Sequence, residues 1–121
     1  MPKIILIVED EEQMAEVLRR QLDACGYLAV NAFDGAEGLK LAREKKPDLV
    51  LLDIGLPIMD GKTLCRLLKR EADTAGAKII MLTGDHLMGD VEDSFTAGAD
   101  IYMNKPYDLT LLLANIEKLI G

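Results

Sequence analysis

Acidic side chains occur at two points of the sequence where a run of apolar residues ends. Glu9, Asp10 and Glu11 follow the run KIILIV, and Asp53 closes the run LVLLD. Carboxylates held a few Å apart repel each other by ~1–4 kcal/mol per pair unless a cation lies between them. Mg²⁺ suits such a place, because it binds one or two carboxylates together with water and phosphoryl oxygens. These residue types favour chemistry assisted by a divalent cation, if the fold brings the two points together.

A hydroxyl and an ammonium group also follow apolar runs. Thr83 comes after KIIML, and Lys105 comes two residues after DIYM. A carboxylate beside Mg²⁺, with a hydroxyl and an ammonium group nearby, can attack phosphorus and hold the resulting acyl phosphate. Asp53 is the predicted nucleophile, because its run is predicted to lie at the centre of the sheet. His86, a single histidine in a predicted loop, is given no role.

The elements that must position these groups alternate along the chain. Five short runs rich in β-branched residues and leucine predict strands, and amphipathic segments after each of them predict helices. The predicted strands are Lys3–Val8, Leu28–Ala32, Leu49–Asp53, Lys78–Leu82 and Asp100–Met103, and the predicted helices are Glu11–Cys25, Gly35–Lys46, Gly61–Thr74, Leu87–Ala97 and Asp108–Ile120. The first, third and fourth strand runs are apolar throughout, which indicates a parallel sheet covered on both faces. The order predicts a doubly wound α/β fold, in which ligands bind at the carboxyl ends of the strands.

Length, charge and cysteine content limit the kind of protein. The 121 residues fit one domain, predicted to span residues 1–121. The net charge of −7 argues against direct binding to nucleic acid or to an anionic membrane, since both require basic patches. The N-terminal apolar run is too short for a signal peptide or a membrane span, so a cytoplasmic protein is expected. Cys25 and Cys65 are expected to be reduced thiols in the core.

Four blocks of the sequence together resemble the receiver domain of two-component response regulators. The blocks are LIVEDEE, LLDIGLPIMDG, MLTG and GADIYMNKP, and the resemblance covers essentially the whole chain. It implies a flavodoxin-like sheet with strand order 2-1-3-4-5, similar to that of chemotaxis regulators. It also implies a phosphorelay receiver, in which Asp53 accepts a phosphoryl group from a histidine kinase or a histidine phosphotransfer protein with the help of Mg²⁺.

The resemblance assigns the metal ligands. By position, Asp10 would bind Mg²⁺ directly, and Glu9 would act close by, through water. Asp53 and the backbone carbonyl of Gly55 would complete the set of protein ligands.

The same resemblance assigns the groups that respond to phosphorylation. Lys105 would bind one phosphoryl oxygen, and Thr83 would move to bond another. Tyr102 would swing inward behind Thr83 as the second switch residue. Pro106 resembles the proline that follows a cis peptide bond in this family.

The resemblance also implies that phosphorylation reshapes an output surface. This surface would consist of the helix predicted at Leu87–Ala97, the strand Asp100–Met103 and the helix Asp108–Ile120. The helix Leu87–Ala97 is predicted to be the least stable, because Gly89 lies near its start. Leu111 is predicted on the outer face of the last helix, where it could contact a partner. The expected partners are the kinase or phosphotransfer protein and a downstream protein, without nucleic acid or membrane. The chain is expected to be a monomer or a weak dimer that depends on phosphorylation.

Other classes of function remain open. A magnesium-dependent, phosphatase-like enzyme could use the same aspartate chemistry, but a second aspartate two residues after Asp53 is missing. A module that works by protein contact alone, independent of phosphorylation, usually lacks Asp53, Lys105 or the acidic pair, and all are present. An FMN carrier is disfavoured, because acids stand where its phosphate loop would need Gly, Ser and Thr. We therefore expect a phospho-accepting signalling domain rather than an enzyme, with self-phosphotransfer and autodephosphorylation only.

Overall fold

Five parallel strands form one sheet in the computed structural model, which describes residues 2–56, 59–84 and 97–121. The strands are β1 (Ile4–Val8), β2 (Leu28–Ala32), β3 (Leu49–Asp53), β4 (Lys78–Thr83) and β5 (Ile101–Asn104). Their order in the sheet is β2-β1-β3-β4-β5, and each pair of neighbours is parallel. The predicted doubly wound α/β fold with flavodoxin-like order is confirmed.

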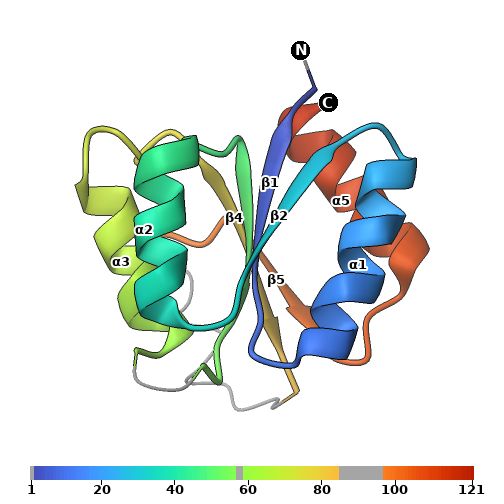
Figure 1. The fold of residues 1–121 in the computed structure, drawn as a ribbon, viewed down its shortest axis with the longest axis horizontal. Coiled ribbons are helices and arrows are strands. Elements are labelled where there is room, and N and C mark those ends of the chain that lie inside the picture. The colour runs from blue at the N-terminus through green and yellow to red at the C-terminus, as the bar shows by residue number, and fades with distance from the viewer. Residues whose placement is uncertain (1, 57–58, 85–96) are drawn as a thin grey trace.

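Helices cover both faces of the sheet. They are α1 (Glu12–Ala24), α2 (Gly35–Lys45), α3 (Gly61–Arg70) and α5 (Leu109–Ile120). Figure 1 shows α1 and α5 on one side of the sheet and α2 and α3 on the other. Residues 87–96 of the predicted fourth helix, with Gly89, lie outside the described residues, as does His86. Within the described ranges, no helix has the length and apolar content needed to cross a lipid bilayer.

The sheet is apolar on both faces because alternate side chains of a strand point to opposite sides. In β1, Leu6 and Val8 belong to the core under α2 and α3, whereas Ile5 and Ile7 belong to the core under α1 and α5. All four side chains are buried, as are the apolar side chains of β3 and β4. This is the arrangement that the uninterrupted apolar runs predict.

Helix α3 is shorter than predicted. It ends at Arg70 rather than Thr74, because the backbone of Glu71 is extended, with φ −82° and ψ 133°. The hydroxyl of Thr74 then donates a hydrogen bond of 2.6 Å to the carbonyl of Leu68, so this buried side chain closes a turn after the helix. A side chain that bonds the backbone competes with helical hydrogen bonding, and the periodic pattern does not reveal such a bond.

The prediction that both cysteines lie in the core is wrong for Cys25. Cys65 is buried, but Cys25 is exposed. The buried residues of α1 include Leu18 and Leu22, and Cys25 continues their spacing. However, α1 ends at Ala24, so Cys25 caps the helix and leaves its buried face.

Candidate functional site

The acidic residues of the first block lie just beyond β1. The N–H of Glu9 donates to the carbonyl of Ala32 at 3.0 Å, which extends the pairing of β1 with β2 by one bond. This bond holds Glu9 at the carboxyl edge of the sheet, where the residue is buried with 7% of its surface exposed. Asp10, the next residue, is exposed.

Asp53 is the last residue of β3 and lies between β1 and β4 in the sheet. The N–H of Gly55 donates to Asp53 Oδ1 at 3.0 Å. The chain turns there because the N–H of Ile54 still bonds the carbonyl of Leu82 at 3.0 Å, and Ile54 in turn accepts a bond from the N–H of Gly61 at 3.0 Å. The strand and the turn together fix the direction of the Asp53 carboxylate.

The fold brings the two acidic points together, as the sequence predicts. Carboxylate oxygens of Glu9, Asp10 and Asp53 all lie within 4.8 Å of one another. Such an oxygen-only set suits a hard divalent cation, and the exposure of Asp10 leaves one side open to water. The residues present therefore fit Mg²⁺.

Lys105 supplies the positive charge of the site. Its Nζ lies 3.0 Å from Glu9 Oε2 and 3.0 Å from Asp53 Oδ2, and its side chain is 18% exposed. The backbone N–H of Lys105 donates to the carbonyl of Thr83 at 2.6 Å, which ties the lysine to the end of β4. The bond between Lys105 and Pro106 is cis, as the resemblance implies.

The carboxyl groups of Glu9 and Asp53 differ in acidity. Burial, together with the hydrogen bond to Asp53, raises the pKa of Glu9 from 4.5 to about 7, although Lys105 opposes this shift. Burial alone would also raise the pKa of Asp53, but hydrogen bonds from Glu9, the Gly55 N–H and Lys105 outweigh it and lower that pKa. At neutral pH, Asp53 is therefore an ionised carboxylate, whereas Glu9 is only partly ionised and is the member of the pair that binds a proton more readily.

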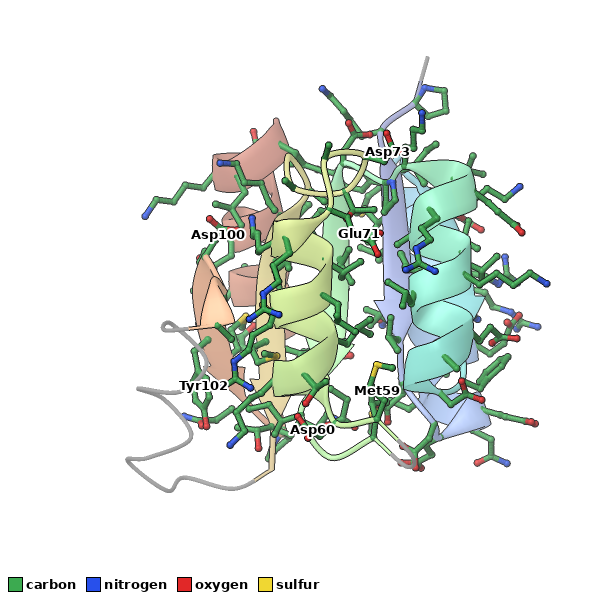
Figure 2. All side chains as sticks on the ribbon, turned by 90° about the vertical axis from the view of Figure 1, so that its left-hand side faces the viewer. Met59, Asp60, Glu71, Asp73, Asp100 and Tyr102 are labelled. Atoms are coloured by element: carbon green, nitrogen blue, oxygen red, sulfur yellow. The ribbon has the colours of Figure 1, made fainter. Side chains whose placement is uncertain are left out.

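The two predicted switch residues occupy the adjoining strands. Thr83 is buried at the end of β4, opposite Asn104 of β5. Tyr102 is half-buried in β5, opposite Met81, and packs against the core on the side of α2 and α3. Figure 2 shows Tyr102 at the end of the molecule where Met59 and Asp60 also lie, which is the end where the strands finish.

Sequence reasoning did not identify Tyr107 as a neighbour of the site. With Glu9 and Lys105 it lines a small space beneath α1, and burial raises the pKa of its hydroxyl. Its only signal in the sequence is its position two residues after Lys105.

Comparison with known proteins agrees with this geometry. The family described as the response regulator receiver domain matches residues 5–117. The polar-differentiation response regulator DivK of Brucella anthropi is 34% identical, over 100% of this chain and 98% of its own length. The DNA-binding dual master transcriptional regulator RpaA of Synechocystis is 38% identical over 99% of this chain, which spans only 49% of RpaA. The chain thus spans about half the length of several curated relatives and nearly all of DivK.

Solved structures show the same likeness. A putative response regulator from Chloroflexus aurantiacus has a TM-score of 0.92 and 32% identity, and covers 99% of this chain and 98% of its own. The receiver domain of the sensor histidine kinase PA1611 from Pseudomonas aeruginosa has a TM-score of 0.90 and 30% identity, over 100% of this chain and 99% of its own. That structure is described with a magnesium ion coordinated in the active site cleft. From its matched residues, its fold and its cluster of three carboxylates with a lysine, the chain belongs to the response regulator receiver domain family.

Proposed function

We propose that this protein receives a phosphoryl group on Asp53 from a phosphohistidine of a histidine kinase or a phosphotransfer protein. The observation that carries the proposal is the environment of Asp53, an ionised carboxylate that touches Lys105 and lies within 4.8 Å of two further carboxylates. In the transfer, an Asp53 oxygen forms a bond to phosphorus, and the bond from phosphorus to the histidine nitrogen breaks. The imidazole takes up a proton as it leaves.

Mg²⁺ would be held by Asp10, Asp53 and the carbonyl of Gly55, with Glu9 nearby. When bound, it supplies positive charge that offsets the negative charge of the phosphoryl oxygens. The Gly55 N–H donates a hydrogen bond of 3.0 Å to Asp53 Oδ1 and so orients the Asp53 carboxylate.

The switch is proposed to follow from the bonds that Lys105 makes. Its Nζ is shared between Glu9 and Asp53 and can turn to a phosphoryl oxygen once Asp53 is phosphorylated. The buried Thr83 hydroxyl stands at the end of the neighbouring strand β4, where it can donate to another phosphoryl oxygen. Tyr102 in the next strand then responds to the movement of Thr83.

Proteins are the proposed partners of the chain in both steps. The net charge of −7 favours a protein over nucleic acid as the downstream target of this segment, although RpaA is described as DNA-binding. The proposed assembly is a monomer or a weak dimer that depends on phosphorylation, and the proposed location is the cytoplasm. The chain acts as a phospho-accepting domain, with autodephosphorylation as its only hydrolysis.

Phosphoryl uptake by variants tests the assignment of Asp53. Asp53→Asn keeps the shape of the side chain and removes the nucleophile, so incubation with acetyl phosphate and Mg²⁺ should leave its intact mass unchanged. The control is Asp73→Asn, an exposed aspartate after α3, which should take up one phosphoryl group as the parent does. Uptake by Asp53→Asn at the parental rate would place the acceptor elsewhere. Continuous release of phosphate from a diffusible phosphoester would instead support the phosphatase.

The proposed output surface can be tested on its described part, β5 and α5. Leu111 is 53% exposed on α5, and it lines a groove with Tyr102, Pro106 and Tyr107. Beryllofluoride, which mimics the phosphoryl group, should change amide hydrogen exchange at Tyr102 and along the first turn of α5. Helix α1 serves as the internal control for general stabilisation. A response confined to the residues that touch Asp53 would exclude β5 and α5 from the output surface.

A further inference from the structure

The turn between β2 and α2 touches the site from two directions without contributing a ligand to it. We call residues Ala32–Glu37 the β2–α2 corner. The carbonyl of Ala32 accepts the bond from the Glu9 N–H at 3.0 Å. Three residues after Ala32, Gly35 meets the segment between β3 and α3, which carries Gly55 and Met59.

The second contact is possible only because residue 35 is glycine. A Cβ on Gly35 would lie 2.7 Å from Met59 Cβ and 2.8 Å from the Met59 carbonyl oxygen. Both distances are too short for non-bonded atoms, so any side chain at residue 35 would push Met59 away. Figure 2 shows Met59 between the first turns of α2 and α3, at the end of the molecule that carries the site.

The corner is stiff, so the displacement would fall on the Met59 side. Asp34 Oδ1 accepts from the N–H of Glu37 at 2.8 Å, and Glu37 Oε1 accepts from the N–H of Phe33 at 2.7 Å. Asp34 is the N-cap of α2, and Glu37 reaches the residue before it, so the two bonds together hold both the entry to the helix and its first turn. Gly35 is the first residue of that turn and is buried.

The segment that carries Met59 is also fixed from its other end. A Cβ on Gly61 would lie only 2.3 Å from the carbonyl oxygen of Asp53, so the start of α3 rests directly on the backbone of Asp53. Met59 is two residues from Gly61, so a movement of Met59 away from α2 would press on the start of α3 and, through Gly61, on the backbone of Asp53. A shift of the Asp53 backbone would in turn change the 3.0 Å bond between the Gly55 N–H and Asp53 Oδ1.

We propose that Gly35 is a positioning residue for the phosphoacceptor site. By letting the start of α2 hold Met59 at van der Waals distance, it sets the place of the Asp53 backbone against Gly61, and so the orientation of the Asp53 carboxylate and the affinity for Mg²⁺. This inference rests on the proposed function of Asp53 and Gly55.

Mg²⁺ titration of matched glycine variants tests the proposal. Gly35→Ala should bind Mg²⁺ about tenfold more weakly than the parent, the lower end of the range for residues that orient metal ligands. Gly38→Ala is the control for packing in the same helix, because its Cβ would lie 3.1 Å from Val8 and 3.2 Å from Leu64, both core side chains. Gly76→Ala is the neutral control, since no atom lies within 4 Å of its Cβ.

Affinity and stability are measured separately for each variant. The dissociation constant of Mg²⁺ is read from the Gly55 amide signal, and stability is read from urea unfolding without metal. We expect Gly38→Ala to change stability with the parental affinity, and Gly35→Ala to change the affinity and the metal-free Gly55 signal. Parental Mg²⁺ affinity in folded Gly35→Ala overturns the proposal.

A second variant serves if Gly35→Ala does not fold. Glu37→Ala removes the bond to the Phe33 N–H without adding atoms, so it should weaken Mg²⁺ binding and shift the Gly55 amide signal in the same direction. A parental affinity and a parental signal in Glu37→Ala overturn the proposal. If the parent itself binds no Mg²⁺, the proposed function fails. If the parent binds Mg²⁺ and Gly35→Ala binds it equally well, only the proposed role of Gly35 fails.

Discussion

At the scale of single residues, the three carboxyl groups of the site are unequal. Glu9 is buried and has a raised pKa, Asp53 has a lowered pKa, and Asp10 is exposed. The difference arises because Glu9 and Asp53 share one lysine and one hydrogen bond. Asp53 therefore holds the negative charge that the proposed attack on phosphorus needs, while Glu9 is only partly ionised at neutral pH, and a bound cation would favour its ionised form.

The raised pKa of Glu9 predicts the pH dependence of the metal-free protein. A carboxyl group whose pKa rises from 4.5 to about 7 on folding stabilises the fold fully below pH 4.5, and this contribution is lost as the pH rises through about 7. Between pH 5 and 8 the parent should lose roughly 1–3 kcal/mol more unfolding free energy than Glu9→Gln, which carries no titrating group there. Urea unfolding of both proteins without Mg²⁺ measures the difference. Parallel losses in the two proteins would show that Glu9 is not the titrating group.

Asp10 predicts opposite effects with and without metal. Asp10→Asn removes the charge of one of three crowded carboxyl groups, so the metal-free melting temperature should rise, by an amount equivalent to about 1 kcal/mol or less at this exposed position. The variant should gain less from Mg²⁺ than the parent, because a ligand is lost. Thermal melts with and without Mg²⁺ measure both effects. Glu11→Gln, an exposed neighbour without a role in the site, is the control, and an unreduced gain in Asp10→Asn would remove Asp10 from the ligand set.

At the scale of the elements, two aspartates join neighbouring strands at their starts in the same way. Asp48 precedes β3, and its Oδ2 accepts from the N–H of Ile4 in β1 at 2.8 Å. Asp100 precedes β5, and its Oδ2 accepts from the N–H of Ile79 in β4 at 2.8 Å. The backbone N–H of Asp48 also donates to the carbonyl of Ile4, and that of Asp100 donates to the carbonyl of Ile79, both at 2.8 Å. These paired bonds fix the register of strands that the chain connects only through long crossovers.

The aspartate of the first pair should contribute measurably to stability. Asp48→Ala leaves the N–H of Ile4 without its acceptor and should lower the free energy of unfolding by about 1–3 kcal/mol. Asp48→Asn keeps an acceptor oxygen and should lose less. Asp73→Ala, exposed near the same edge, is the control for loss of an acid. Chemical denaturation ranks the three variants, and equal stability of Asp48→Ala and Asp73→Ala would contradict the role of this bond.

The elements also show what the sequence can predict. The bounds of β2 and β3 match the prediction to the residue. For β3 the reason is that a strand buried on both faces is an uninterrupted apolar run, whereas β2 is an edge strand of mixed burial. The end of α3 and the exposure of Cys25 were not predicted, since both depend on where a helix stops. The closeness of Asp53 and Lys105 could be predicted, because both residues follow strands of one parallel sheet and because the resemblance places them together. The contact between Gly35 and Met59 could not be predicted, because it joins two segments that are remote in sequence. No local pattern encodes such a contact.

At the scale of the whole molecule, the two ends of the sheet differ in charge. Glu9, Asp10 and Asp53 gather at the carboxyl ends of the strands. Lys3, Lys46 and Lys78 line a groove at the opposite end, with Asp48 and Asp73 among them. The described part of the molecule therefore presents its site as an acidic surface, which raises the local concentration of cations and of basic partner surfaces.

The strand order has a further consequence during synthesis on the ribosome. β1 pairs with both β2 and β3, so these three neighbouring strands and all three carboxylates of the site have been synthesised once residue 53 has emerged. Lys105, the only ammonium group that bonds Glu9 and Asp53 among the described residues, emerges about fifty residues later. If the first half of the sheet assembles as it emerges, its carboxylates are gathered before their lysine is available. Over that interval, cations from the surrounding solution must offset the repulsion, so free Mg²⁺ would favour the nascent half-sheet before any phosphoryl group is transferred.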